Sequence, residues 1–158
     1  WIHHNQVAWY KRQSCSYTKA NGNTPLPALA FFHIPLPEYY EAYNNPKYKP
    51  IGRRIESEGT SSINSGLFSA FFEQGDVMGV FVGHDHDNDY VGYLYGIALG
   101  YGRHTGANYP YREMCRGARI FRMYEGKHNF DTWVRLENYR VIDWKTVHFP
   151  SSFLHQGN

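Results

Sequence analysis

Apolar residues occur along this chain mostly in short runs that are bounded by glycine, proline and polar residues. The run at 77–82 is β-branched and aromatic and lacks helical spacing, so it predicts a buried strand. The run at 28–32 predicts a second buried strand. A histidine follows each run. His33 comes directly after 28–32, and His84 follows 77–82 with Gly83 between them. We expect a sharp turn at Gly83. The pattern therefore places two imidazoles at the ends of two strands.

Two segments have the composition and boundaries of helices. Residues 5–20 predict a helix, which an Asn-Gly-Asn sequence ends. A phenylalanine-rich stripe predicts another helix, capped by Ser62 or Asn64 and running to Gln74, with Gly75 as its C-terminal cap. Because this second helix lies between the two predicted strands, the order strand–helix–strand indicates a parallel β-α-β unit.

The second half of the chain is strand-rich. Residues 90–100 predict one or two strands, and 117–124 and 130–136 predict two more, joined as a hairpin by 125–129. The tyrosine-rich excursion at 38–61 predicts a structured loop that forms a rim over a cleft. The expected fold class is α/β, with mixed β-sheets flanked by helices.

Composition limits the classes of protein to consider. The chain has 158 residues, 42% of them hydrophobic and 19% charged, which suits one globular domain over 1–158 with a loosely ordered tail at 137–158. The formal net charge of +2 gives no argument for a nucleic-acid partner, and no run of 18 apolar residues predicts a membrane span. Cys15 and Cys115 allow a single disulfide, but the sequence cannot decide whether they pair.

The candidate chemistry lies with His33, His84 and His86. Three imidazoles from two strand ends can form a mononuclear zinc site with an open position. They can also belong to a two-metal site in which carboxylates supply the remaining and bridging ligands. A solvated loop whose histidines have no function is the third interpretation.

Three aspartates alternate with other residues in the same loop. Asp85 should point away from its flanking histidines, because neighbouring side chains of an extended chain point to opposite sides. Asp87 and Asp89 either orient the ligands as hydrogen-bond acceptors or form turns. No Ser-His-Asp arrangement, P-loop or dinucleotide fingerprint is evident.

These motifs carry a family resemblance. Residues 31–37 (Phe-Phe-His-Ile-Pro-Leu-Pro), followed by the Gly-His-Asp-His of 83–86, resemble the second half of a calcineurin-like metallophosphoesterase. Residues 6–10 resemble the helix after that family's Gly-Asn-His motif, and 101–106 and 116–120 resemble the branch related to purple acid phosphatases. The resemblance covers nearly the whole chain and implies half of an α-β-β-α sandwich.

The resemblance also implies a set of functional residues. His33 and His84 would ligate the second of two metal ions (Fe, Zn or Mn) and His86 the first, and the ions would activate a water that attacks a phosphate-ester substrate. Arg103 either holds a phosphate oxygen or is a salt-bridged turn residue. His104 either protonates the leaving group or is a surface residue.

The chain also departs from the family. It lacks the Asp-x-His and Gly-Asn-His motifs of the first half, no counterpart of the bridging aspartate is identified, and it starts at Trp1 without an initiator methionine. We therefore expect the C-terminal half of a phosphatase or phosphodiesterase, inactive without the missing N-terminal half. The alternatives are a non-catalytic scaffold or binding module and a mononuclear zinc hydrolase. The family suggests an extracytoplasmic location, and the substrate cannot be deduced.

Overall fold

Four strands form a mixed sheet, sheet A, at the centre of the molecule. The computed structural model describes residues 1–106 and 115–142. The strands of sheet A are β1 (Ala28–Phe31), β2 (Val77–Val82), β3 (Val91–Leu94) and β4 (Ile97–Tyr101), in the order β1-β2-β4-β3. Strands β1 and β4 run parallel to β2, and β3 is antiparallel to β4. The predicted strands and the parallel β-α-β unit are confirmed, and 90–100 forms two strands.

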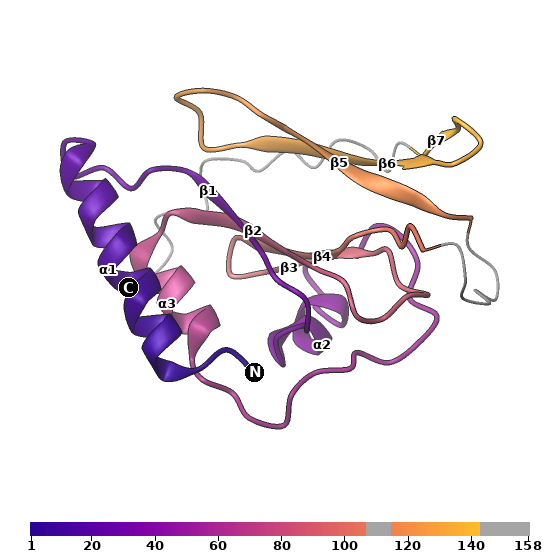
Figure 1. Cartoon of the computed structure of the whole chain (residues 1–158), viewed down its shortest axis with the longest axis horizontal. Coiled ribbons are helices and arrows are strands. Elements are labelled where there is room, and N and C mark those ends of the chain that lie inside the picture. The colour runs from indigo at the N-terminus through magenta and orange to yellow at the C-terminus, as the bar shows by residue number, and fades with distance from the viewer. Residues whose placement is uncertain (107–114, 143–158) are drawn as a thin grey trace.

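A second sheet, sheet B, is antiparallel and lies above sheet A in Figure 1. Its strands are β5 (Gly117–Met123), β6 (Phe130–Leu136) and β7 (Val141–Ile142). Strands β5 and β6 pair along their full length, which confirms the predicted hairpin. The sequence predicts a loosely ordered tail at 137–158, of which 143–158 lie outside the described residues. Its described part, 137–142, forms a turn and β7.

Two helices lie side by side against one face of sheet A (Figure 1). These are α1 (His4–Ala20) and α3 (Leu67–Gln74), and the ring of Tyr10 meets that of Phe71 edge-on at 4.8 Å. Helix α3 starts later than predicted, because Gly66 has a left-handed backbone with φ +75° and ends the preceding loop. Its predicted cap at Gly75 is confirmed, with φ +69°.

A short helix, α2 (Glu38–Tyr43), lies inside the tyrosine-rich excursion and was not predicted. Tyr39 is fully buried, and its hydroxyl donates to the carbonyl oxygens of Val80 and Gly100 at 2.9 and 3.1 Å. The backbone of α2 lies so close to Gly92 that a Cβ there would come within 2.7 Å of a carbonyl oxygen. The prediction that the tyrosines of 38–61 form a rim is thus wrong for Tyr39, which belongs to the core.

The layers stack as helices, sheet A and sheet B. On the face of sheet A opposite the helices, Phe81 packs against Phe121 and Phe130 of sheet B, at ring distances of 4.5 and 5.8 Å. This α-β-β arrangement confirms the α/β class with mixed sheets. Among the residues that the structure describes, no helix is long and apolar enough to cross a membrane.

Strand β1 is not the buried strand that its apolar sequence predicts. It forms an edge of sheet A within the described part of the chain, and Phe31 is 60% exposed. An apolar run predicts a strand from its local pattern, but the number of neighbours that cover the strand depends on the tertiary structure.

Candidate metal-binding loop

His33 and His84 lie side by side because their strands are parallel neighbours. The ladder between β1 and β2 continues beyond the strand ends, where Phe32 N donates to Phe81 O at 3.3 Å and Gly83 N donates to His33 O at 3.1 Å. The two imidazoles therefore emerge at the same edge of sheet A. Nε2 of His33 lies 3.4 Å from Nδ1 of His84, and the ring planes are 83° apart.

This separation suits two ligands of one metal ion. It is longer than the usual 2.7–3.2 Å of an N–H donor bond in proteins. Two nitrogens at about 2.0–2.1 Å from a tetrahedral zinc ion lie about 3.3 Å apart. His33 Nε2 and His84 Nδ1 thus fit two coordination positions of such an ion.

The sharp turn after β2 occurs at His84 and not at Gly83. His84 has a left-handed backbone with φ +72°, whereas Gly83 has no positive φ. The amide of Asp85 donates to the carbonyl oxygen of Gly83 at 2.9 Å, which closes the turn. A non-glycine residue in this region is uncommon and carries strain, so the surrounding contacts must hold His84 in place.

His86 lies beside His104. Nδ1 of His104 donates to the carbonyl oxygen of His86 at 3.0 Å, and the two rings are 6.5 Å apart. Burial lowers the pKa of His104, against the bond to His86, which raises it. The described residues contain no group of three His, Cys, Asp or Glu side chains that could hold a metal ion. The three-imidazole zinc site is therefore not assembled in this structure.

The carboxylate of Asp85 points away from the histidines into the protein, as the alternation predicts. It is buried and accepts hydrogen bonds from Gly59 N at 3.0 and 3.1 Å and from the Tyr101 hydroxyl at 2.6 Å. Burial and the bond to Asp85 raise the pKa of Tyr101, so this hydroxyl stays protonated and donates. A Cβ on Gly59 would lie 2.6 Å from the ring of His84. Gly59 thus forms a close backbone wall behind His84.

Residues 83–89 after β2 form the histidine loop. Residues 51–59, which we call the strap, run along it without regular secondary structure. The Asn88 side chain forms three hydrogen bonds with the strap: its Oδ1 accepts from Ile55 N and Glu56 N at 2.9 and 3.2 Å, and its Nδ2 donates to Glu56 O at 3.0 Å. Asn88 is almost completely buried. The amide of Asp87 donates to Glu56 Oε1 at 2.7 Å. The Asp/Asn-rich sequence after His84 therefore anchors the strap.

Asp89 and Arg103 form a buried ion pair beneath the loop. Asp89 also accepts from Arg53 N at 2.7 Å, and Arg103 Nε donates to Cys115 O at 2.7 Å. Arg119 of sheet B donates to the backbone oxygen of Asp89, and burial lowers its pKa to about 10. The geometry matches the salt-bridged alternative for Arg103, whose phosphate contact stays a prediction.

No bridging carboxylate is evident among the described residues. Asp85 and Asp89 hold the loop through the contacts above. The dipeptide Gly75-Asp76 has the composition of a Gly-Asp motif, but it precedes β2 at the opposite end of the strand, and Asp76 accepts the Tyr10 hydroxyl. Oδ1 of Asp87 is buried without a hydrogen-bond partner. The described part of the chain therefore fits imidazole ligands better than it fits a complete two-metal site.

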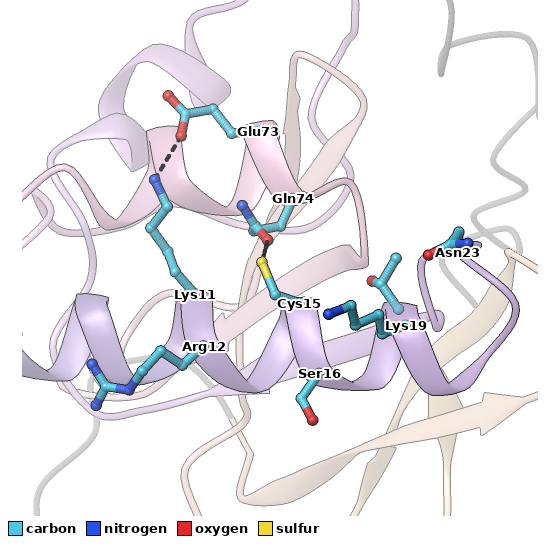
Figure 2. Close-up of a pocket in the computed structure, with 9 residues that line it drawn as sticks. Lys11, Arg12, Cys15, Ser16, Lys19, Asn23, Glu73 and Gln74 are labelled. Carbon is cyan, nitrogen blue, oxygen red and sulfur yellow. Dashed lines mark hydrogen bonds and ion pairs between the residues drawn. The ribbon is translucent and has the colours of Figure 1, made fainter.

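A separate depression of about 740 Å³ lies between α1 and α3 (Figure 2). Lys11 forms an ion pair with Glu73 at 3.0 Å across it, and Cys15 Sγ donates to Gln74 Oε1 at 3.2 Å. It shares no residue with the histidine loop. Cys15 and Cys115 are both free and exposed, so the disulfide that the sequence allows is not formed.

Comparison with known proteins finds similar proteins from Arabidopsis thaliana. The chain is 34% identical over 163 residues to probable inactive purple acid phosphatase 14 and 36% identical over 149 residues to probable inactive purple acid phosphatase 28. These matches cover 90% and 93% of this chain but only 40% and 36% of the relatives. Probable inactive purple acid phosphatase 29 is 41% identical over 110 residues, which are 65% of this chain and 27% of the relative. No protein-family model and no solved structure matches.

Proposed function

Because this chain belongs to the branch of the calcineurin-like metallophosphoesterases that is related to purple acid phosphatases, we propose that it supplies imidazole ligands to a two-metal phosphoesterase centre. The observation that supports this proposal is the 3.4 Å approach of His33 Nε2 to His84 Nδ1. In this proposal His33 and His84 hold one ion and His86 the other, and the ions are Fe, Zn or Mn. When bound, such ions bind phosphate oxygens and lower the pKa of a bound water.

The chain's own residues hold these ligands in place. The ladder between β1 and β2 fixes His33 beside His84, and the buried carboxylate of Asp85 fixes the turn between His84 and His86 through Gly59. Because the backbone of both histidines is held in place, metal binding costs less backbone entropy than it would in a mobile loop. The substrate in this proposal is a phosphate ester.

The proposal includes a requirement for further sequence. Three imidazoles cannot hold two dications close together without an anionic bridge, and the described residues offer no bridging carboxylate. The chain spans 27 to 40% of the length of the relatives that it matches. We therefore propose that the phosphoesterase needs an N-terminal half that this chain lacks, and that the 158 residues alone hydrolyse no phosphate ester.

Zinc titration by isothermal calorimetry tests the metal ligands. The chain should bind Zn²⁺, and His33→Ala and His84→Ala should each weaken binding about 10- to 100-fold. His4→Ala is the control, because His4 is exposed at the start of α1 and should leave zinc binding unchanged. Equal affinities for all four proteins would contradict the proposal.

A phosphatase assay tests the requirement for more sequence. The chain with added Zn²⁺, Mn²⁺ or Fe²⁺ should hydrolyse 4-nitrophenyl phosphate no faster than the metal ions alone. Turnover that His86→Ala abolishes would show that this chain is sufficient for catalysis and would overturn that requirement.

A non-catalytic scaffold or binding module is the second candidate function. The names of the three relatives, all "probable inactive", favour it. A scaffold without metal should show the same zinc binding in the wild type, His33→Ala and His84→Ala. The calorimetric titration therefore separates the two candidates.

A further inference from the structure

The depression between α1 and α3, which we call the α1–α3 groove, has a basic wall. Its volume of about 740 Å³ lies within the range of about 300–1,000 Å³ that ligand sites in proteins span. Helix α1, the loop after it and the end of α3 line the groove, with the residues Lys11, Arg12, Cys15, Ser16, Thr18, Lys19, Asn23, Glu73 and Gln74. Three of these side chains are cationic and one is anionic.

Helix α1 concentrates positive charge on this side of the protein. It contains Lys11, Arg12 and Lys19 but no Asp or Glu, although the whole chain has a formal net charge of only +2. Lys11 forms the ion pair with Glu73 across the groove. Arg12 and Lys19 are exposed and form no ion pair with any residue that the structure describes. The groove therefore holds two cations whose charge no described side chain neutralises.

The spacing of Arg12 and Lys19 suits two carboxylates of one extended chain. The two residues lie on either side of Cys15 along α1 (Figure 2), and seven residues of α-helix make two turns with a rise of about 10.5 Å. In a polyproline II chain every third residue lies on the same face, about 9.3 Å further along. Between the two cations, the hydroxyl of Ser16 can exchange hydrogen bonds with a peptide backbone. A peptide with a carboxylate at every third position thus matches the groove.

Glu73 favours an acidic peptide over a nucleic acid. Its side chain is 60% exposed in the wall of the groove, so it repels a ligand that carries a negative charge on every unit. A nucleic acid has a phosphate on every nucleotide. A peptide with uncharged residues between its carboxylates can place a backbone N–H at Glu73 instead. The small net charge of the chain also gives no long-range attraction for a nucleic acid.

We propose that the α1–α3 groove binds an acidic peptide segment of a partner protein, with its carboxylates at Arg12 and Lys19. The guanidinium of Arg12 can bind a carboxylate through two parallel N–H···O bonds, and Lys19 supplies a point charge. Recognition of acidic segments by clustered cations is a common mode of peptide binding. The groove shares no residue with the histidine loop, so this interaction needs no metal ion and is independent of the proposed phosphoesterase function.

Fluorescence anisotropy tests this proposal with a peptide of three Ala-Pro-Glu repeats that has blocked termini and a neutral label. A control peptide with Gln in place of each Glu should bind about tenfold more weakly. Arg12→Gln and Lys19→Gln should each weaken binding of the Glu peptide about threefold. The matched control Lys49→Gln removes an exposed lysine outside the groove and should not. Glu73→Gln should strengthen binding about threefold, because it removes a like charge and frees Lys11.

Alkylation of Cys15 by iodoacetamide, a neutral reagent, locates the bound peptide. Cys15 is exposed in the wall of the groove, so in a Cys115→Ser variant the Glu peptide at saturation should slow its alkylation and the Gln peptide should not. Unchanged alkylation with the Glu peptide bound would overturn the groove as the site.

Two further outcomes would overturn the proposal. Equal affinities for the two peptides, or an equal loss of binding in Lys49→Gln and Arg12→Gln, would mean that the groove has no specific role. Tighter binding of a nine-nucleotide single-stranded DNA than of the Glu peptide would replace the acidic peptide by a nucleic acid.

Discussion

The backbone amide of Gly59 donates to both carboxylate oxygens of the buried Asp85, at 3.0 and 3.1 Å. These residues are 26 positions apart, and their contact joins the strap to the loop that carries the two histidines of the His-x-His motif. The Tyr101 hydroxyl closes the same contact from the end of β4. The orientation of His84 thus depends on residues outside the three candidate histidines.

Tyr101→Phe should destabilise the protein by about 1–3 kcal/mol, because it removes a donor from a buried carboxylate. Urea unfolding measures this change. Tyr95→Phe is the control, since Tyr95 is 69% exposed and its loss of a hydroxyl should cost less than about 0.5 kcal/mol. Similar losses in both variants would show that the bond to Asp85 contributes nothing to stability.

Gly59→Ala should displace the His84 ring. A Cβ at position 59 would lie 2.6 Å from the ring and 2.7 Å from Asp85 Oδ1, so the strap must shift, at a cost of about 1–3 kcal/mol. Gly102→Ala is the matched control, because its Cβ would lie 3.4 Å from the nearest atom, Val82 O. Thermal unfolding and the chemical shifts of the His84 ring give the readout. An unmoved His84 ring in Gly59→Ala would contradict the close packing.

Asn88→Asp should loosen the strap. The substitution keeps the shape and the acceptor atom but places a carboxylate oxygen against Glu56 O, where Nδ2 now donates at 3.0 Å. The expected loss is about 1–3 kcal/mol, with faster tryptic cleavage after Arg53 and Arg54. The exposed Asn138→Asp keeps its acceptor bond from Arg140 N and serves as the control. Equal cleavage rates for both variants would argue against an anchoring role.

Glu58 should give the protein a pH-dependent stability. Burial alone would raise the pKa of Glu58, but hydrogen bonds from Arg54 and the Tyr90 hydroxyl lower it below its usual 4.5. The carboxylate therefore stabilises the fold above about pH 4.5, and this contribution disappears as the pH falls through the folded-state pKa. Glu58→Gln should lower the melting temperature at pH 7 and lose this difference towards pH 3.

The exposed Glu73→Gln is the control for this pH series. Glu73 pairs with Lys11 in a solvent-exposed ion pair, so its replacement should change the melting temperature little at any pH. A difference between wild type and Glu58→Gln that stays constant from pH 7 to pH 3 would show that the charge of Glu58 is not responsible.

Local sequence patterns predict most of the strands and the place of the histidines. The run at 77–82 is a fully buried strand, 130–136 is a strand with the predicted bounds, and Gly75 caps the helix before β2. These features depend on neighbours within a few residues. His33 and His84 follow strands, so parallel pairing alone brings them together.

Side-chain roles in the loop were harder to predict. The sequence left two roles open for Asp89, as a turn former or as a hydrogen-bond acceptor that orients a metal ligand. In the structure it forms a buried ion pair with Arg103 and lies against Arg119. On β5, Arg119 and Phe121 face sheet A, although Ala118 and Ile120 on the opposite side of the strand are both apolar. A period of two separates the faces of a strand, but a second sheet decides which face is covered.

The sequence by itself determined the α/β class, the strand ends and the two histidines that follow them, because hydrophobic periodicity and chain direction are local properties. Only the tertiary structure decided that Phe31 lies on an exposed edge, that Tyr39 is core, and that Asp85 and Asn88 anchor the strap. The roles of Tyr39, Asp85 and Asn88 depend on contacts between residues 16 to 61 positions apart, and no local pattern encodes such contacts.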